Sequence, residues 1–364
     1  MCSPEPTTAP ALIADTRREA AALPQPPLLV RQPLEALLDR HGIGDGPLEA
    51  TLLGEGQSNV TLALRRGGAR VVLRRPPSRR SVRATRNVQR EARLLRLLEP
   101  TAARAPKVLL TCSDPAVIGV PFYVMEEVAG TVITSTLPAR LDDAAGRAAV
   151  ARELVDALVE LHDIDLASSG LHAIGRSDDF LERHLRRWSE VWERHRTREL
   201  PVLDEVTRWL GANLPRPSSA PTLVHGDYRL GNVVFAAAGS ARLRAVLDWE
   251  IASIGDPLCD LAWMLTTWPE PDDPAGTLLT MAGAVAPAGF PSRAELAARY
   301  AELSGRPVAG LSWYTALALW RAAIGLETLR ERALRGSAED VFVRELAVGV
   351  PELADRALTA ALAG

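Results

Sequence analysis

The sequence predicts an α+β fold, in which a β-rich N-terminal region precedes a mainly helical C-terminal region. Residues 60–64 and 70–75 are short, apolar or alternating segments separated by a glycine-containing turn, a pattern that favours a β-hairpin. Residues 231–235 and 243–247 repeat this pattern around a turn of small residues. Residues 144–162 instead carry apolar side chains at helical spacing. Strands and helices therefore both contribute to the fold.

Three regions are expected along the 364-residue chain, which is long enough for one large or two modest domains. Residues 1–30 contain proline, alanine and scattered charges, and we expect a flexible leader there. Residues 31–128 are expected to form an N-terminal lobe with a nucleotide-phosphate loop. Residues 129–364 are expected to form a helical C-terminal lobe with the catalytic and metal-binding loops. Within it, residues 180–210 are predicted to be helical and to place their tryptophans in the core.

The composition predicts a cytoplasmic protein. The first 30 residues lack the apolar core of a signal peptide, and no run approaches the roughly 18 apolar residues of a membrane span. Cys2, Cys112 and Cys259 are far apart and form no C-x-x-C pair, so neither a disulfide framework nor a zinc site is indicated. We therefore expect a soluble protein in a reducing compartment, with no membrane partner; the oligomeric state stays open.

The charge balance excludes a general nucleic-acid binder. The chain has 42 basic and 45 acidic residues, for a formal net charge of -3, and this gives no electrostatic case for nucleic-acid binding. Residues 65–96 are nevertheless locally very basic. This segment is either a solvated helix and loop or a region that attracts a polyanionic substrate or nucleotide, and both interpretations stay open.

The segment from residue 223 to residue 262 carries the main functional pattern. His225, Asp227 and Asn232 form the motif H-x-D-x-x-x-x-N, and Asp248 follows an apolar run. This layout is typical of phosphoryl transfer, where one carboxylate accepts or orients the proton of an attacking hydroxyl. An amide oxygen and a second carboxylate then hold the Mg²⁺ that bridges the nucleotide phosphates. Asp227 is predicted to take the first role, and Asn232 and Asp248 the second.

The residue types suit this chemistry. The transferring phosphoryl group spreads negative charge, so catalysis rests on positioning and on cations, and Mg²⁺ prefers oxygen ligands such as those of Asp and Asn. The alternative is that the motif arises by chance and its aspartates cap turns. The conjunction with Asp248 and with the N-terminal features below favours the functional interpretation.

A phosphate-covering hairpin is predicted near the N-terminus. Residues 48–53 lead into GEGQSN at residues 54–59, and a second strand follows. Gly56 and Ser58, with the neighbouring backbone N–H groups, are the candidates to contact phosphate oxygens. A simple hairpin turn would use the two glycines equally well.

Two further nucleotide contacts are expected in the same lobe. Arg74 ends the strand VVLR and is a candidate cation for the α- and β-phosphates, with Glu91 on the helix predicted at about residues 84–98 as its partner. An ordinary surface salt bridge is the alternative. Arginine replaces the usual lysine, which keeps the charge but changes the geometry. Backbone groups from Glu126 to Val128 are predicted to meet the purine, unless this segment is an ordinary edge strand.

The motifs HGDYRLGNVVF and VLDWEIASIGDPLCDLAW resemble the phosphotransferase family named for aminoglycoside phosphotransferases, to which choline kinase is related. The likeness spans roughly residues 48–263. GQSN, LRRPP, RE and DWE also resemble a branch found as the kinase-like domain of proteins fused to acyl-CoA dehydrogenases. The resemblance implies a protein-kinase-like two-lobed fold with ATP and Mg²⁺ between the lobes, with GTP as an alternative nucleotide.

The resemblance also implies roles for single residues. It assigns Asp227 as base, Asn232 and Asp248 as metal ligands, and Arg74 with Glu91 as the phosphate-anchoring pair. The resemblance further assigns Asp260 to the support of the catalytic loop, and Asp256 either does the same or caps a turn. His225 is expected to brace the loop, and Tyr228 and Arg229 sit beside the base and could touch the acceptor. His162, at the end of the helix predicted over residues 144–162, is expected to be a polar helix-end residue rather than a catalyst.

The expected function is ATP-dependent phosphorylation of a small-molecule hydroxyl. A hydroxyacyl-CoA is one candidate acceptor, suggested by the branch likeness and the basic N-terminal lobe. An aminoglycoside or macrolide antibiotic kinase is the alternative within the same reaction class, although arginines lie among the acidic residues 178–187. A nucleotide-binding pseudokinase is the alternative of another class, which the presence of the base and both metal ligands disfavours.

Overall fold

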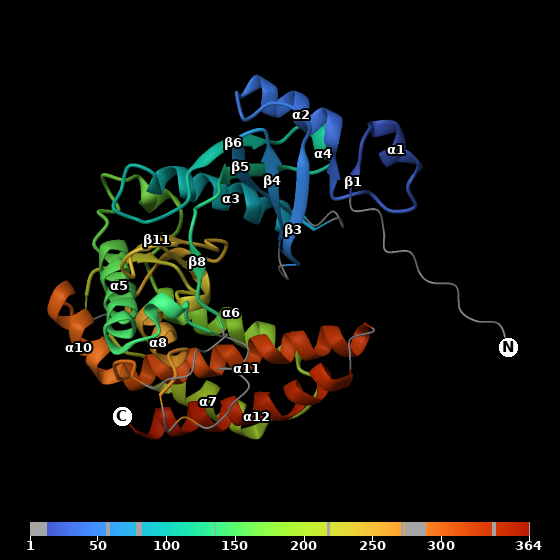
Figure 1. The fold of residues 1–364 in the computed structure, drawn as a ribbon. Helices are drawn as coiled ribbons and strands as arrows, with labels where there is room; N and C mark the ends of the chain where they lie inside the picture. The colour runs from blue at the N-terminus through green and yellow to red at the C-terminus, as the bar shows by residue number, and fades with distance from the viewer. Residues whose placement is uncertain are drawn as a thin grey trace. The chain divides into compact units, whose positions relative to one another are not determined.

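The computed structural model describes residues 13–55, 59–77, 82–134, 136–216, 219–270, 273, 289–336 and 340–363. The chain divides into two compact units. Unit 1 comprises Met1–Glu99 and Pro106–Val128, and unit 2 comprises Pro100–Ala105 and Ala129–Gly364. Unit 1 is built on a β-sheet and unit 2 is mainly helical (Figure 1), which confirms the α+β class.

Unit 1 contains a five-stranded antiparallel sheet with the strand order β3-β4-β5-β7-β6. Its strands are β3 (Glu49–Glu55), β4 (Val60–Arg66), β5 (Ala69–Arg75), β6 (Val108–Cys112) and β7 (Phe122–Glu126). Leu62 lies opposite Leu73 in the β4-β5 pair. The hairpin predicted from residues 60–64 and 70–75 therefore forms between β4 and β5.

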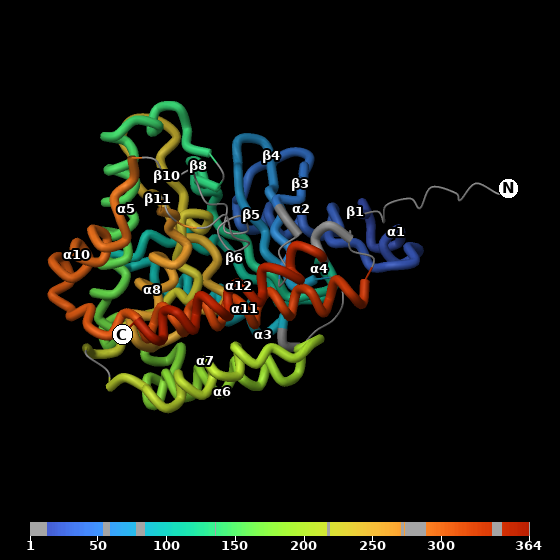
Figure 2. The backbone as a smooth tube through the Cα atoms, turned by 90° about the horizontal axis from the view of Figure 1, so that it is seen from below, coloured from blue at the N-terminus to red at the C-terminus, as the bar shows by residue number. Residues whose placement is uncertain are grey.

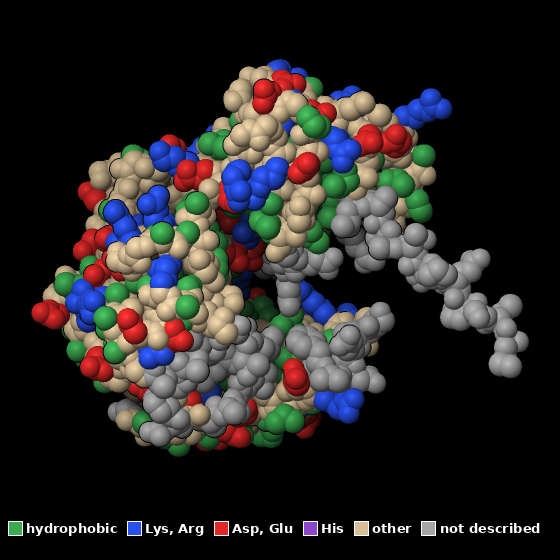
Figure 3. Space-filling view, in the orientation of Figure 1, with side chains coloured by type: hydrophobic (Ala, Val, Ile, Leu, Met, Phe, Trp, Pro, Cys, Tyr) green, Lys and Arg blue, Asp and Glu red, His purple; other side chains and the backbone are tan. Residues whose placement is uncertain are grey.

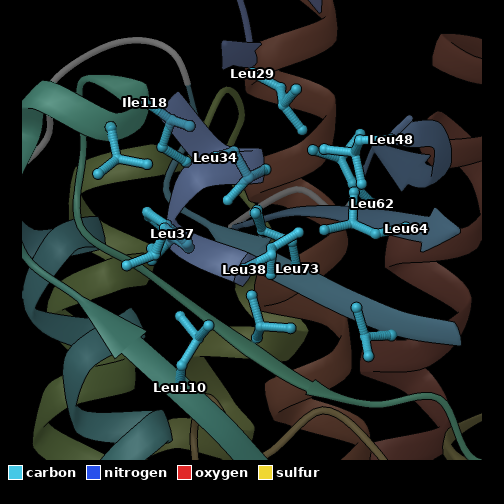
Figure 4. Close-up of a cluster of buried hydrophobic side chains, with 14 of the residues drawn as sticks. Leu29, Leu34, Leu37, Leu38, Leu48, Leu62, Leu64, Leu73, Leu110 and Ile118 are labelled. Carbon is cyan, nitrogen blue, oxygen red and sulfur yellow. The ribbon is translucent and has the colours of Figure 1, made fainter. Parts of the chain in front are cut away.

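Helices cover the sheet of unit 1 because its strands are apolar on both faces. Leu62 and Leu64 of β4 pack with Leu34 and Leu38 of α2 (Arg31–Arg40) in a buried cluster (Figure 4). The short helix α4 (Pro115–Ile118) contributes to the same cluster. Helix α3 (Val82–Leu98) packs against β5, β6 and β7.

Residues 13–30 differ from the expected flexible leader. They form β1 (Ile13–Ala14), α1 (Arg17–Ala22) and β2 (Leu29–Val30), with β1 and β2 paired in parallel. A capping box between Thr16 and Glu19 begins α1, and the buried Arg75 donates to the carbonyl oxygens of Pro27 and Leu28. Such short elements have no periodicity that a sequence pattern can reveal.

Residues 100–105 also differ from the expected division, because they belong to unit 2 rather than to the N-terminal lobe. The Arg104 guanidinium explains this assignment. It donates to Glu160 and Glu153 of α5, each at 2.7 Å, and to the carbonyl oxygen of Leu243 at 2.9 Å. The Arg104 side chain, together with its carbonyl oxygen, which accepts from the Val246 backbone N–H at 2.5 Å, therefore holds this segment to unit 2.

The helices of unit 2 pack in pairs. α11 (Leu311–Arg335) and α12 (Asp340–Leu362) lie side by side in both views, with α6 (Phe180–His195) and α7 (Pro201–Ala212) packed against them (Figures 1 and 2). Among its described residues, unit 2 also contains α5 (Ala144–His162), α8 (Leu258–Thr266) and α10 (Arg293–Ser304). The predicted helical region 180–210 is thus two helices, because proline begins the second.

Two small antiparallel sheets support the loops of unit 2. One has the order β11-β10-β8, with β8 (Thr131–Val132), β10 (Val233–Phe235) and β11 (Leu243–Val246); the other pairs β9 (Thr222–Val224) with β12 (Ser253–Gly255). The second predicted hairpin is therefore present. The loop between β9 and β10 carries Asp227 and Asn232, and the loop after β11 carries Asp248.

The charge distribution on the surface and the character of the helices can be compared with the expectations on nucleic-acid and membrane binding. Acidic and basic side chains are interspersed on the face that Figure 3 shows, rather than gathered into areas of one sign. Among the described residues, no helix combines the length and apolar character that a membrane crossing needs.

Candidate active site

The loop between β9 and β10 brings Asp227 and Asn232 into contact. The Asn232 side-chain Nδ2 donates to Asp227 Oδ2 at 2.7 Å and to the Asp227 carbonyl oxygen at 2.9 Å. Asn232 is buried and 7% exposed, whereas the Asp227 side chain is 27% exposed. Because the amide nitrogen makes both bonds, the amide oxygen of Asn232 is the atom that can serve a cation.

The second carboxylate oxygen of Asp227 is held by Trp263, which the sequence patterns did not single out, and lies near Arg229, which they did. Trp263 Nε1 donates to Asp227 Oδ1 at 2.6 Å, and Arg229 Nε lies 3.4 Å from the same oxygen. The Arg321 guanidinium stacks 4.7 Å from the Trp263 ring centre and donates to the Gly226 carbonyl oxygen at 2.7 Å. Each oxygen of Asp227 thus accepts from one neutral donor, while Arg229 lies beside Oδ1 and Arg321 stacks on the indole that donates to it.

The buried carboxylate of Asp260 anchors the loop between β9 and β10. Asp260 is fully buried (0% exposed) and accepts the backbone N–H of His225 at 2.6 Å and that of Gly226 at 2.7 Å. His162 lies 3.4 Å from Asp260 and 2.7 Å from the Tyr300 hydroxyl. Burial opposes the charged form, but the contacts with His162, His225 and Gly226 outweigh it and lower the pKa of Asp260. The expected loop-supporting role of Asp260 is confirmed.

His225 connects the two loops as a neutral imidazole. The Asp227 backbone N–H donates to His225 Nδ1 at 3.2 Å, so Nδ1 must be an acceptor. The proton is therefore on Nε2, which donates to the Leu247 carbonyl oxygen at 2.9 Å. The ring also packs edge-on against Trp249, with centroids 4.8 Å apart. His225 braces the loop, as expected.

Asp248 lies in a tight turn beside Asn232. The Leu247 backbone N–H donates to the Asn232 carbonyl oxygen at 2.7 Å, which ties the turn to the loop before β10. Asp248 has a φ of 65°, a left-handed backbone that is uncommon for residues other than glycine, asparagine and aspartate. The backbone hydrogen bond therefore brings the backbone of Asp248 close to Asn232, which directly precedes β10.

The donor set fits a hard divalent cation. Asn232 and Asp248 offer an amide and a carboxylate oxygen, and the described residues contain no group of three His, Cys, Asp or Glu side chains that could hold a metal ion. Mg²⁺ characteristically takes one or two carboxylates and keeps water and phosphate as its other ligands. A sparse oxygen pair is therefore suited to Mg²⁺ and unsuited to a protein-caged metal such as zinc.

Tyr228 and Asp256 both make hydrogen bonds that stabilise the fold. Tyr228 is buried and its hydroxyl donates to the Leu154 carbonyl oxygen at 2.7 Å; burial raises its pKa well above the usual value. The expectation that Tyr228 could touch an acceptor is therefore wrong. Asp256 accepts from the Leu258 backbone N–H at 3.0 Å and from the Tyr314 hydroxyl at 2.6 Å, which agrees with its expected role as a cap.

Unit 1 brings the predicted cation and its partner together. Arg74 Nε on β5 lies 3.1 Å from Glu91 Oε2 on α3, and the Glu91 side chain is only 1% exposed. The pair is therefore largely buried rather than an ordinary surface salt bridge. Whether it anchors phosphates stays a prediction.

Four other residues are predicted to contact the nucleotide: Gly56, Ser58, Glu126 and Val128. Gly56 and Ser58 lie outside the described residues. The Glu126 backbone N–H donates to the Lys107 carbonyl oxygen at 2.9 Å, so this group is already committed within the sheet. Val128 lies beyond the end of β7, and a purine contact by either residue stays a prediction.

Comparisons with known proteins identify the family. The pattern of the phosphotransferase enzyme family matches residues 49–296. Acyl-CoA dehydrogenase family member 10 of Mus musculus is 30% identical over 330 residues, which are 90% of this chain and 30% of that protein. The chain spans about a third of the length of the curated relatives that it matches.

Solved structures extend the comparison. A Ralstonia eutropha JMP134 protein described as a candidate aminoglycoside phosphotransferase is 29% identical, with a TM-score of 0.76 over 91% of this chain and 98% of that chain. The GDP and kanamycin complex of APH(2")-IIIa is 17% identical, with a TM-score of 0.60 over 90% and 97% of the two chains, and shows the fold alone. The chain therefore belongs to the phosphotransferase enzyme family and is a kinase-type enzyme with the kinase-like fold of that family.

Proposed function

We propose that this protein transfers the γ-phosphate of ATP to a hydroxyl group of a small molecule, with Asp227 as the base. The observation that carries the proposal is the arrangement of Asp227: a part-exposed carboxylate, oriented through Oδ1 by Trp263 and through Oδ2 by Asn232. A base must be held within hydrogen-bonding reach of the proton that it accepts. The fixed carboxylate would orient the acceptor hydroxyl and take up its proton.

The chain's own residues would organise the rest of the site. Asn232 and Asp248 would hold Mg²⁺, which when bound neutralises charge on the nucleotide phosphates. His225 keeps the two ligand-bearing loops together, since it bonds to Asp227 and Leu247 at once. In unit 1, Arg74 supplies a cation for the phosphates and Glu91 fixes its orientation.

The acceptor that fits best carries negative charge. Arg229 lies 3.4 Å from Asp227 Oδ1, and Arg321 stacks on the Trp263 ring whose N–H donates to the same oxygen. Cations at this position repel a polyamine such as an aminoglycoside and attract an anion. A hydroxyacyl-CoA meets this condition, and the longer curated relatives are named for acyl-CoA dehydrogenases.

The test follows the label of γ-labelled ATP, and separately of GTP, with Mg²⁺ and a panel of acceptors. The panel contains a hydroxyacyl-CoA, kanamycin, a macrolide and a fractionated metabolite extract. We expect label in the thioester or in an anionic metabolite. Label in kanamycin or the macrolide would instead favour an antibiotic kinase. Saturable nucleotide binding without transfer or hydrolysis would favour a pseudokinase.

Replacing Trp263 by phenylalanine should lower kcat about 10- to 100-fold with little change in the nucleotide KM. The substitution removes the N–H that donates to Asp227 Oδ1, and a hydrogen bond to a charged group contributes about 1.5–3 kcal/mol. Trp192→Phe is the matched control, because it removes an indole donor to Asp204 at 3.0 Å on other helices. Equal losses of kcat in both variants would show a merely structural effect.

Replacing Arg74 by glutamine should weaken nucleotide binding about tenfold or more, measured by titration with ATP. The change removes the cation that Glu91 orients, and a charge-assisted contact with phosphate is among the stronger hydrogen bonds. Arg70→Gln is the control on the same strand, since the more exposed Arg70 pairs with Glu127 at 2.7 Å. An Arg74 variant that binds ATP as tightly as the control would remove Arg74 from the phosphate site.

A further inference from the structure

A cavity of about 200 Å³ lies among α8, α10, α11 and α12 of unit 2. Most of its wall is aliphatic: Leu265, Ala294, Ala297, Leu311 and Leu319. An apolar cavity of about 150 Å³ is large enough to bind benzene. This cavity therefore has room for one aromatic ring or one short branched chain with a small polar group.

One polar side chain in the wall lacks a partner. Thr266, at the C-terminal end of α8, is 4% exposed, and its hydroxyl has no hydrogen-bond partner among the described residues. The adjacent Thr267 behaves differently, since its hydroxyl donates to the carbonyl oxygens of Trp263 and Met264 at 3.0 and 3.1 Å. A buried hydroxyl left unpaired is costly, so Thr266 favours an occupant that offers an oxygen.

The guanidinium of Arg356 in the same wall also has a nitrogen without a hydrogen-bond partner among the described residues. Arg356 of α12 lines the cavity, its Nη1 is buried without a hydrogen-bond partner among the described residues, and its ion pair with Glu352 is long, at 4.0 Å. The other arginine of the wall, Arg293, is fully engaged with Asp273 at 2.5 Å and with the Leu265 carbonyl oxygen at 2.8 Å. Of the two arginines in the wall, Arg356 is therefore the one that can donate a hydrogen bond to an additional anionic group.

We propose that this cavity is a second small-molecule site, which takes a compact monocarboxylate with an apolar body. The Thr266 hydroxyl and the Arg356 guanidinium would donate to the carboxylate, and the aliphatic wall would cover the body. None of the residues that line the cavity is among those that contact Asp227. The site is thus separate from the base, although Thr266 follows Trp263 by one turn on α8.

The test titrates the full chain with benzoate and with its neutral counterpart benzyl alcohol, using ligand-observed NMR. We expect saturable benzoate binding in the millimolar range or tighter, and binding of benzyl alcohol that is at least tenfold weaker. Absent benzoate binding, or equal affinity for the two compounds, would overturn the proposal. This comparison needs no variant and so does not depend on how a substitution folds.

Variants then locate the site. Thr266→Val keeps the shape but removes the hydroxyl, and should weaken benzoate binding about tenfold. Ala297→Leu should fill the space and abolish binding while the variant still melts cooperatively and binds nucleotide. Thr328→Val is the control, because the Thr328 hydroxyl already donates to the Ile324 carbonyl oxygen within α11. Benzoate binding that survives Ala297→Leu unchanged would place the ligand elsewhere and overturn the assignment.

Discussion

Replacing Asp227 by asparagine is expected to lower kcat by about 10²–10⁴, the range associated with loss of a general base, while the Kd for ATP changes little. Asparagine keeps the shape of the side chain, and its carbonyl oxygen can still accept the Trp263 N–H that Asp227 accepts at 2.6 Å. What is lost is the negative charge that would receive the proton of the acceptor hydroxyl, together with the Oδ2 that accepts from Asn232 Nδ2. Label transfer and ATP titration measure the two quantities separately.

The matched control for Asp227 is Asp204→Asn. Asp204 also accepts an indole N–H, from Trp192 at 3.0 Å, but it lies on α7 away from the catalytic loop. This variant should retain the turnover of the unmodified protein. An Asp227→Asn protein that retains kcat within a factor of ten would show that another group accepts the proton. Weakened ATP binding in the same variant would instead indicate that Asp227 contributes to the nucleotide site.

Replacing Asp260 by alanine is expected to lower the free energy of unfolding by about 3–5 kcal/mol, the range found when one partner of a buried charged network is removed. The change deprives the backbone N–H groups of His225 and Gly226 of their acceptor and leaves His162 without its carboxylate. Urea unfolding, followed by tryptophan fluorescence, measures the loss. The catalytic loop should lose its order first, so turnover should fall at urea concentrations below the main transition.

Asp165→Ala is the control for Asp260. Asp165 also accepts a backbone N–H, that of Ala167 at 2.8 Å, but it is exposed. Its removal should cost far less stability, because water replaces the lost acceptor. Similar losses in the two variants would contradict the anchoring role of Asp260.

The stabilisation by Asp260 should also depend on pH in a defined direction. Its pKa in the folded protein lies below the ordinary value of 3.8, since the contacts with His162, His225 and Gly226 outweigh the effect of burial. The folded state therefore binds the proton less readily than the unfolded chain does. The contribution is fully present above about pH 4 and is lost as the pH falls through the folded-state pKa. Urea unfolding of the unmodified protein and of Asp260→Asn should converge over that range.

The parts of the site that the sequence predicted are those joined by short spacing. A five-residue step lets one loop carry both Asp227 and Asn232, and the structure joins them at 2.7 Å. The hairpin that follows was visible as two apolar runs around a turn, and it brings Asp248 back to the same place. Local periodicity and turn chemistry are properties of neighbouring residues, so a single sequence can show them.

The parts that the sequence did not predict depend on packing between distant segments. Trp263 could have been suspected, since it follows Asp260 by three residues on α8 and the two share a helix face. Arg321 lies on α11, and no spacing connects it with the loop that it contacts at Gly226. Tyr228 illustrates the reverse case: its position beside the base suggested a substrate contact, and only the fold shows that it is buried against Leu154.

The left-handed backbone of Asp248, with its φ of 65°, restricts how this position can diverge among related sequences. Asparagine and glycine adopt this conformation at little cost, whereas β-branched residues are strongly disfavoured there. Substitution by asparagine or glycine would therefore weaken or remove the carboxylate chemistry and keep the turn. Relatives that have lost the carboxylate at this position but keep the fold should therefore carry one of these two residues here.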